Sequence, residues 1–333
     1  MLRMLIGLLA AFALSALLGP TMIKLLRKLH VGQNIYELAP ESHKKKQGTP
    51  TMGGLLFALV TTAVALVLHQ GGFSRTADLA LPAIVFSLLN LCIGFADDFT
   101  KKRGGKNQGL TELQKLALQI VLAAAFSVYC FLNPQVGSSI YVPFLRREWD
   151  LGWVYVPVMM FVIICTANGS NLLDGLDGLC GGVSAVVMGA FALMTLICSC
   201  LFPNVAGFES LGTLCACACG ALLGYLCYNF HPAKVMMGDT GSMYLGGLVV
   251  STAMLMRLPL LIPLAAGAMA ASLLSVFMQR YYFKLTHGKR IFKMSPLHHH
   301  FEKCGVEETR IVSMYVLVTV LLCALALAGI VIL

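Results

Sequence analysis

The stretch Asn171-Leu172-Leu173-Asp174-Gly175-Leu176-Asp177-Gly178 separates two long apolar runs in a chain that is mostly compatible with lipid. If the stretch is helical, its asparagine and two aspartates are spaced i, i+3 and i+6 and share one face. Carboxylates at the end of a membrane span are costly unless a cation lies opposite them. The alternative is a polar turn in which the two glycines break a helix. That alternative leaves the repeated acids unexplained, so we expect a functional motif here.

The composition is that of an integral membrane protein. Of the 333 residues, 58% are apolar and 12% are charged, and the mean hydropathy is +0.81. Soluble domains have about 25% charged residues. Many apolar runs are roughly 20 residues long, which indicates helices, because the strands of a barrel alternate and need only about 10 residues. Their even spread predicts one domain, a polytopic bundle over residues 1–333.

The predicted fold class is an all-α polytopic membrane protein with about ten transmembrane helices. The first span has the charge and apolar length of a signal peptide, but no small-residue cleavage site follows it, so we expect a retained helix. The spans are expected at roughly 2–25, 53–69, 79–96, 116–132, 152–167, 182–202, 209–228, 243–257, 259–283 and 311–333.

Positive charge is strongly biased toward one set of loops. These loops and the helix ends beside them hold most of the 24 Lys and Arg residues. By the positive-inside rule they face the cytoplasm, and both termini face outward. The loops are 26–52, 97–115, 168–181, 229–242 and 284–310. On the outward side, residues 133–151 are expected to form a small hairpin with Pro143 at an edge or bulge.

The twelve cysteines predict no disulfide framework. Most of them fall in apolar runs, where cysteine behaves as a small hydrophobic residue. Cys215, Cys217 and Cys219 alternate along the chain, and a two-residue step on a helix turns about 200°. We therefore expect packing residues rather than a metal site.

Five acids lie beside predicted spans on the cytoplasmic side, in three separate loops. They are Asp97 and Asp98 after the third span, Asp174 and Asp177 in the opening motif, and Asp239 before the eighth span. Mg²⁺ prefers oxygen ligands and is commonly held by one or two carboxylates together with substrate phosphates. Three lysines on the same side are suited to a pyrophosphate: Lys46, Lys101 and Lys115. The pattern predicts a single Mg²⁺-dependent phosphate site.

The adjacent residues Asp97 and Asp98 cannot point the same way on a helix, so we expect different roles for them. One accepts a proton or attacks, and the other faces the metal or a lysine. Acids at the C-terminal end of a helix are mildly unfavourable, because the helix dipole is negative there. Their presence at this helix end therefore favours a functional role over a plain helix end. Asp239 precedes Thr-Gly-Ser and an apolar run, so it is a candidate helix N-cap. A helix N-terminus also binds phosphate, and the two interpretations are compatible.

Three consecutive histidines, His298, His299 and His300, lie in the last cytoplasmic loop. Consecutive histidines spread their rings, whereas a zinc site needs its ligands to converge. We therefore expect donors to substrate oxygens, with a structureless tract as the alternative. The sequence has no P-loop, GxGxxG or Gly-x-Ser-x-Gly motif, which argues against ATPases, dinucleotide enzymes and hydrolases.

The motifs taken together resemble the phospho-N-acetylmuramoyl-pentapeptide transferase family of the polyprenyl-phosphate N-acetylhexosamine-1-phosphate transferase superfamily, over essentially the whole chain. The superfamily shares the acidic motifs at 94–98 and 171–178. The stretches GTPTMGG at 48–54 and PLHHHFE at 296–302 favour the muramoyl-pentapeptide branch. Further matching stretches are 228–229, 232–242, 283–286 and 288–292. Two departures are Leu173, where the family has Thr, and Phe230-His231, which replaces the more usual residues before Pro232.

The resemblance implies transfer of phospho-MurNAc-pentapeptide from UDP-MurNAc-pentapeptide to undecaprenyl phosphate, giving lipid I and UMP with Mg²⁺. It implies the bacterial plasma membrane, a cytoplasmic active site and a homodimer, with no nucleic acid as partner. By their positions in the motifs, the implied catalytic residues are Asp97, Asp98, Asp239 and His298, with Asp239 as the metal ligand. The implied substrate-binding residues are Lys46, Lys101, Asn171, Asp174, Asp177, Asn229, Gln279, His299 and His300.

Two routes and two other functions stay open at this point. In the direct route the lipid phosphate attacks the β-phosphorus while Asp97 or Asp98 accepts its proton. The other route passes through a phospho-aspartate. The competing functions are a sibling transferase that uses UDP-GlcNAc and an ion-coupled transporter. A transporter predicts acids near mid-span and paired broken helices.

Overall fold

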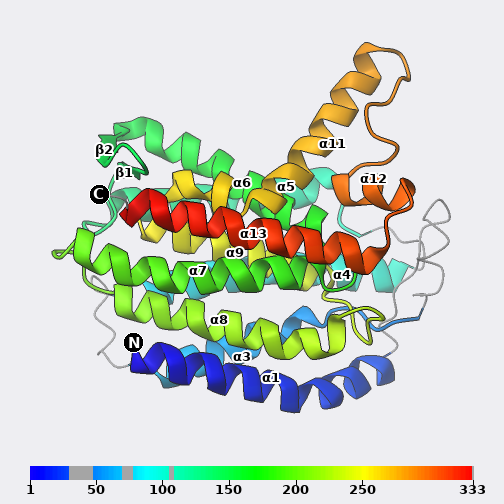
Figure 1. Ribbon diagram of the computed structural model, residues 1–333, viewed down its shortest axis with the longest axis horizontal. Coiled ribbons are helices and arrows are strands. Elements are labelled where there is room, and N and C mark those ends of the chain that lie inside the picture. The colour runs from blue at the N-terminus through cyan, green and yellow to red at the C-terminus, as the bar shows by residue number, and fades with distance from the viewer. Residues whose placement is uncertain (30–47, 70–77, 105–108, 332–333) are drawn as a thin grey trace.

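The computed structural model describes residues 1–29, 48–69, 78–104 and 109–331, whose main helices run side by side in one bundle (Figure 1). Among these residues, 7 helices are long and apolar enough to cross a membrane. They are α1 (Leu2–Lys28), α4 (Ala80–Gly104), α5 (Glu112–Leu132), α6 (Tyr155–Leu173), α7 (Leu179–Leu201), α8 (Phe208–Asn229) and α13 (Glu308–Val331). The prediction of a helical multi-pass membrane protein is confirmed.

The span predicted at 259–283 is not one straight helix. The short helices η2 (Pro259–Leu261) and α10 (Ile262–Ala265) meet α11 (Gly267–Leu285) at an angle of 82°. The break lies at Ala266, whose backbone leaves the helical region at φ −100° and ψ 34°. Beyond it, α11 leans away from the bundle (Figure 1). Helix α3 (Gly54–Val67), with 14 residues, is also shorter than the predicted span at 53–69.

Helix α9 (Gly238–Leu255) lies inside the bundle, in contact with α3, α4, α6 and α7. Every residue from Thr240 to Leu255 is buried, including the hydroxyl residues Ser242, Ser251 and Thr252. A Cβ added at Gly94 of α4 would lie 2.1 Å from the backbone oxygen of Asp239. Glycine at this position therefore lets the polar end of α4 approach the N-terminus of α9.

The predicted hairpin is confirmed as strands β1 (Ser139–Val142) and β2 (Arg147–Asp150), which pair antiparallel. Pro143 lies in the turn between them. The backbone nitrogen of Tyr141 donates to the backbone oxygen of Arg257 at 2.9 Å, which joins the hairpin to the chain after α9. Both chain termini lie at the hairpin end of the bundle, and α12 (Leu297–Lys303) lies toward the opposite end (Figure 1).

The cysteines are free thiols, as the sequence predicts. Cys215, Cys217 and Cys219 are buried within α8. They pack as small apolar residues.

The stretch 171–178 is a helix end followed by a turn. Helix α6 ends at Leu173 and a turn follows, so the asparagine and the two aspartates do not share one helical face, and the functional role of the stretch stays a prediction. Gly178 has φ +77°, which favours glycine. A Cβ added at Gly175 would lie 2.2 Å from Nε2 of His298. The turn therefore packs directly against α12.

Candidate active site

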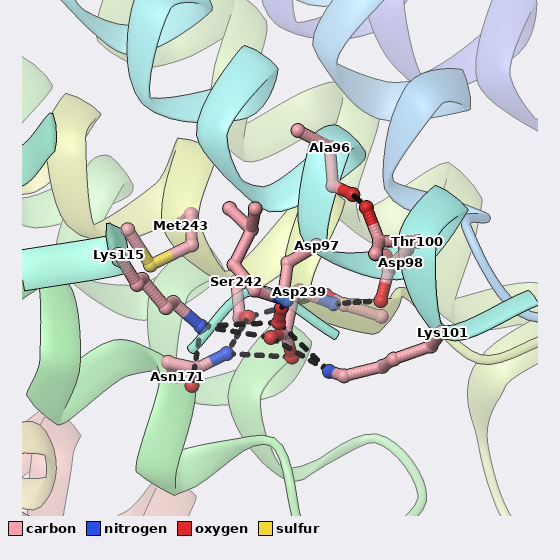
Figure 2. A network of polar contacts seen from close by, with 12 residues as sticks. Ala96, Asp97, Asp98, Thr100, Lys101, Lys115, Asn171, Asp239, Ser242 and Met243 are labelled. Atoms are coloured by element: carbon pink, nitrogen blue, oxygen red, sulfur yellow. Dashed lines mark hydrogen bonds and ion pairs between the residues drawn. The ribbon is translucent and has the colours of Figure 1, made fainter. Parts of the chain in front are cut away.

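The end of α4 directs its two adjacent aspartates to different partners (Figure 2). Oδ2 of Asp97 lies 2.9 Å from Nζ of Lys101, one helical turn further on. Oδ1 of Asp97 accepts a hydrogen bond of 2.7 Å from the backbone nitrogen of Leu110. Asp98 points instead to the start of α9. The expectation that the pair does not share one direction is confirmed.

Asp98 acts as a cap for α9, although it belongs to another helix. Its Oδ1 accepts from the backbone nitrogen of Asp239 at 3.2 Å, and its Oδ2 accepts from that of Thr240 at 2.9 Å. The Thr240 hydroxyl donates to the same Oδ2 at 2.7 Å. A carboxylate here satisfies donors that the first turn leaves open and matches the helix dipole. The expectation that Asp239 is the N-cap is wrong, because Met237 occupies the cap and Asp239 lies inside the first turn.

Four charged side chains, Asp97, Lys101, Lys115 and Asp239, form what we call the transfer cluster (Figure 2). Oδ2 of Asp239 lies 3.0 Å from Nζ of Lys101 and 2.8 Å from Nζ of Lys115. Nζ of Lys115 is also 3.5 Å from Oδ2 of Asp97. Two carboxylate oxygens from α4 and α9 thus face the same two cations. Among the four, Lys101 is the most accessible, with 38% of its side chain exposed.

Asn171, at the end of α6, joins this cluster as the sequence predicts. Its Nδ2 donates to Oδ1 of Asp239 at 2.9 Å and to Oγ of Ser242 at 2.9 Å. Ser242 was not predicted as a site residue. Lys115 was predicted only as one of three lysines suited to a pyrophosphate, not as a residue that contacts the acids of the site. Lys115 carried a usable signal, because Thr111 and Gln114 form a capping box that starts α5 and places Lys115 at its first turn.

A second group, which we call the turn cluster, contains Asp177, His231 and Glu308. Oδ2 of Asp177 lies 3.1 Å from Nδ1 of His231 and accepts from the backbone nitrogen of Ala233 at 3.0 Å. Oε2 of Glu308 is 3.4 Å from the same Nδ1, and its Oε1 accepts from the backbone nitrogen of Asp177 at 2.6 Å. The five acids therefore do not all meet at one point. The turn after α6 directs Asp177 toward α13, while Asp174 stays at the C-cap of α6.

Two residues predicted to bind substrate hold backbone segments together. Asn229 accepts from the backbone nitrogen of Gly178 at 3.1 Å and donates to the backbone oxygen of Val235 at 2.8 Å. Oε1 of Gln279 accepts from the backbone nitrogen of Phe292 at 2.8 Å. Both side chains stabilise loops at the polar end of the bundle.

The three histidines belong to helix α12, so the alternative of a structureless tract is wrong. His298 is buried against the turn that follows α6. Nδ1 of His299 lies 3.1 Å from Oε2 of Glu302, and Nδ1 of His300 accepts from the backbone nitrogen of Lys293 at 3.1 Å. The rings have different surroundings, as expected for consecutive positions. Lys46, also predicted to bind substrate, lies outside the described residues.

Comparison with known proteins gives consistent matches over the chain. Residues 80–257 match Glycosyl transferase family 4, and residues 46–57 match the phospho-N-acetylmuramoyl-pentapeptide-transferase signature 1. The chain is 42% identical over 320 residues to a phospho-N-acetylmuramoyl-pentapeptide-transferase of Clostridium novyi, covering 96% of this chain and 94% of that protein. A protein of the same description from Clostridium kluyveri is 43% identical over 323 residues, covering 97% and 98%. One from Caldanaerobacter subterraneus is 43% identical over 313 residues, covering 94% of each chain.

Proposed function

The chain belongs to the phospho-N-acetylmuramoyl-pentapeptide-transferase family, and from this premise we propose its reaction and the residues that perform it. The protein transfers phospho-MurNAc-pentapeptide from its UDP carrier to undecaprenyl phosphate, which yields lipid I and UMP for peptidoglycan synthesis. The transfer cluster is the observation that supports this chemistry most directly. Paired carboxylates and lysines at one end of a membrane bundle suit the charge of two phosphate-bearing substrates.

The proposed architecture is one transferase domain over 1–333 with ten membrane crossings, counting α3, α9 and the bent pair as spans. Both termini lie at the hairpin end (Figure 1), as an even number of crossings requires. The opposite end holds the transfer cluster and the basic loops, so it faces the cytoplasm by the positive-inside rule. The homodimer implied by the resemblance is kept as a proposal, which the mass of the purified detergent complex tests.

Mg²⁺ fits the donor set of the transfer cluster. Oδ2 of Asp97 and Oδ2 of Asp239 both lie within 3.5 Å of Nζ of Lys115, so two hard oxygen ligands from different helices converge on one cationic position. Asp239 is the residue that would hold the ion, with Asp97 beside it. When bound, Mg²⁺ neutralises the pyrophosphate and makes its β-phosphorus more electrophilic.

The side chains of the chain itself account for the remaining steps. Lys101 and Lys115 bind phosphate oxygens and offset their charge, and Asn171 orients Asp239 through its amide. Asp97 accepts the proton of the undecaprenyl phosphate. The freed oxygen attacks the β-phosphorus, and the bond from that phosphorus to the bridging oxygen breaks, so that UMP leaves. Asp98 is not the base in this scheme, because its carboxylate faces the start of α9, whereas Asp97 faces the two lysines that bind the phosphate.

The nucleotide and sugar are proposed to bind beside the turn 174–178. This turn lies near a cavity of about 740 Å³, bordered by residues of the 231–233 and 302–309 segments. Asp174 and the histidines of α12 supply polar contacts to the substrate. Asp177 contributes by holding the turn, since its Oδ2 is already bonded to Ala233 and His231.

The reaction is tested with purified protein in detergent, Mg²⁺ and undecaprenyl phosphate. UDP-MurNAc-pentapeptide and UDP-GlcNAc are supplied in separate assays, and UMP is measured. We expect UMP only from the muramoyl nucleotide. Release from UDP-GlcNAc alone refutes the assignment and supports the sibling transferase.

A single-turnover experiment separates the two chemical routes. The enzyme is mixed with nucleotide substrate labelled in the β-phosphate, without the lipid, and then denatured. The direct route predicts no label on the protein. Label on Asp97 establishes the two-step route through a phospho-aspartate.

A further inference from the structure

The turn cluster brings three metal-ligand atoms together from segments far apart in the sequence. Oδ2 of Asp177, Nδ1 of His231 and one carboxylate oxygen of Glu308 lie within 4.8 Å of one another. They come from the turn after α6, the loop after α8 and the first turn of α13. Zn²⁺ is bound in proteins by histidine nitrogens and by aspartate or glutamate oxygens, the two kinds of atom that this cluster offers.

The two carboxylates of this cluster are buried beside the imidazole of His231. Only 1% of the Asp177 side chain and 9% of the Glu308 side chain are exposed. Two buried carboxylates this close to each other are costly unless hydrogen-bond donors or a cation lie between them. Nδ1 of His231 occupies that place, 3.1 Å from one carboxylate and 3.4 Å from the other. A metal ion bound to this nitrogen and to one oxygen of each carboxylate would place a cation between the two acids.

Backbone groups orient the carboxylates in the manner of a metal site. The nitrogen of Ala233 donates to Asp177, and the nitrogen of Asp177 donates to Oε1 of Glu308. The second donor leaves Oε2 of Glu308 facing the imidazole. Outer hydrogen bonds of this kind fix the ligands of metal centres.

An ion also has a path to these atoms. Asp177, His231 and Glu308 all border the cavity of about 740 Å³. The His231 side chain is 43% exposed, so one side of the cluster is open to solvent. Three protein ligands with an open fourth position are typical of an exchangeable zinc site rather than a closed structural one.

We propose that Asp177, His231 and Glu308 form a site for a divalent transition ion of the Zn²⁺ class, separate from the Mg²⁺ of the transfer cluster. The ion is held by Nδ1 of His231 and by one oxygen each of Asp177 and Glu308. The imidazole nitrogen selects against Mg²⁺, which prefers oxygen alone. The bound ion ties α13 to the turn after α6. This inference does not rest on the proposed reaction.

The test uses the full-length protein in detergent, stripped with a chelator and then kept in excess Mg²⁺. Zn²⁺ is titrated while bound metal and the melting temperature are measured for the wild type, His231→Gln and His287→Gln. His287 is an exposed histidine outside the cluster and serves as the matched control. We expect one Zn²⁺ to bind the wild type and His287→Gln and to raise their melting temperatures. His231→Gln is expected to bind one Zn²⁺ fewer than the wild type and to show no rise in melting temperature when Zn²⁺ is added.

Equal Zn²⁺ uptake by the wild type and His231→Gln overturns the proposal, since the metal is then bound elsewhere, for example at α12. Absence of Zn²⁺ binding by the wild type also overturns the proposal. The visible absorption of Co²⁺ on the wild type gives a second measurement that does not depend on a variant. Bands without thiolate charge transfer support the site, and a thiolate spectrum at the first equivalent contradicts it.

Discussion

The transfer cluster and the turn cluster each bring two carboxylates to positive charge at the polar end of the bundle, but different groups hold them. In the transfer cluster both carboxylates share two lysine side chains, which are long and rotate freely, beside one bond each from Leu110 and Asn171. In the turn cluster the carboxylates are fixed by backbone nitrogens and an imidazole. Lysines can move to a phosphate and leave the carboxylates to a metal, whereas backbone donors stay in place while the loops are folded. The transfer cluster is therefore suited to catalysis, and the turn cluster is suited to holding the surrounding loops in place.

Removing the charge of Asp239 is expected to have the largest effect. Asp239→Asn should lower kcat by about 100-fold or more, since it removes the metal carboxylate that stabilises charge in the transition state. UMP release at saturating substrate measures it. Asp150→Asn, in the exposed hairpin strand, serves as the control and should keep full activity. Wild-type activity in Asp239→Asn would reject the metal role.

Asp97 and Asp98 are adjacent in α4, but we expect the first to act in catalysis and the second to stabilise the fold. Asp97→Asn should lower kcat by about 100-fold, the usual range for loss of a general base, with little change in melting temperature. Asp98→Asn should instead lower the free energy of unfolding by about 1–2 kcal/mol, because the anionic cap of α9 is lost. Kinetics and thermal unfolding of both variants test the contrast. Equal melting temperatures for the two variants contradict it.

Lys115 tests whether the lysines bind the nucleotide substrate. Lys115→Met keeps the length of the side chain but removes its charge, so KM for the nucleotide should rise by roughly 10-fold, as expected for one charged hydrogen bond. Lys284→Met, on the exposed end of α11, is the matched control. An unchanged KM for Lys115→Met would show that this lysine only balances the acids.

A change at Asn229, whose side chain holds the loops beside the turn cluster, is expected to have the smallest effect on catalysis. Asn229→Ala removes bonds to Gly178 and Val235, so it should destabilise the protein by about 1–3 kcal/mol and leave KM nearly unchanged. Asn204→Ala, in an exposed loop, is the control for thermal unfolding. A raised KM at wild-type stability would favour the substrate-binding role that the sequence predicts.

Several features were predictable because they depend on local patterns. Long apolar runs predicted the helices, and the outward loop 133–151 predicted the hairpin, although Pro143 lies in its turn rather than at an edge or bulge. The bend at Ala266 was not predictable, since the apolar pattern continues across it from Pro259 to Phe283. The buried position of α9 was also hidden, because a helix shielded by its neighbours need not be as apolar as one that faces lipid.

The sequence by itself determined the class of fold and the residues that carry charge into it. In lipid a backbone must satisfy its own hydrogen bonds, so apolar runs of this length form helices, and acids beside them indicate function. Only the tertiary structure decided the partners of those acids. Asp98 meets Thr240 across 142 positions of the chain, and Asp177 meets Glu308 across 131. Such contacts follow from how the helices pack, and no local spacing in the sequence specifies them.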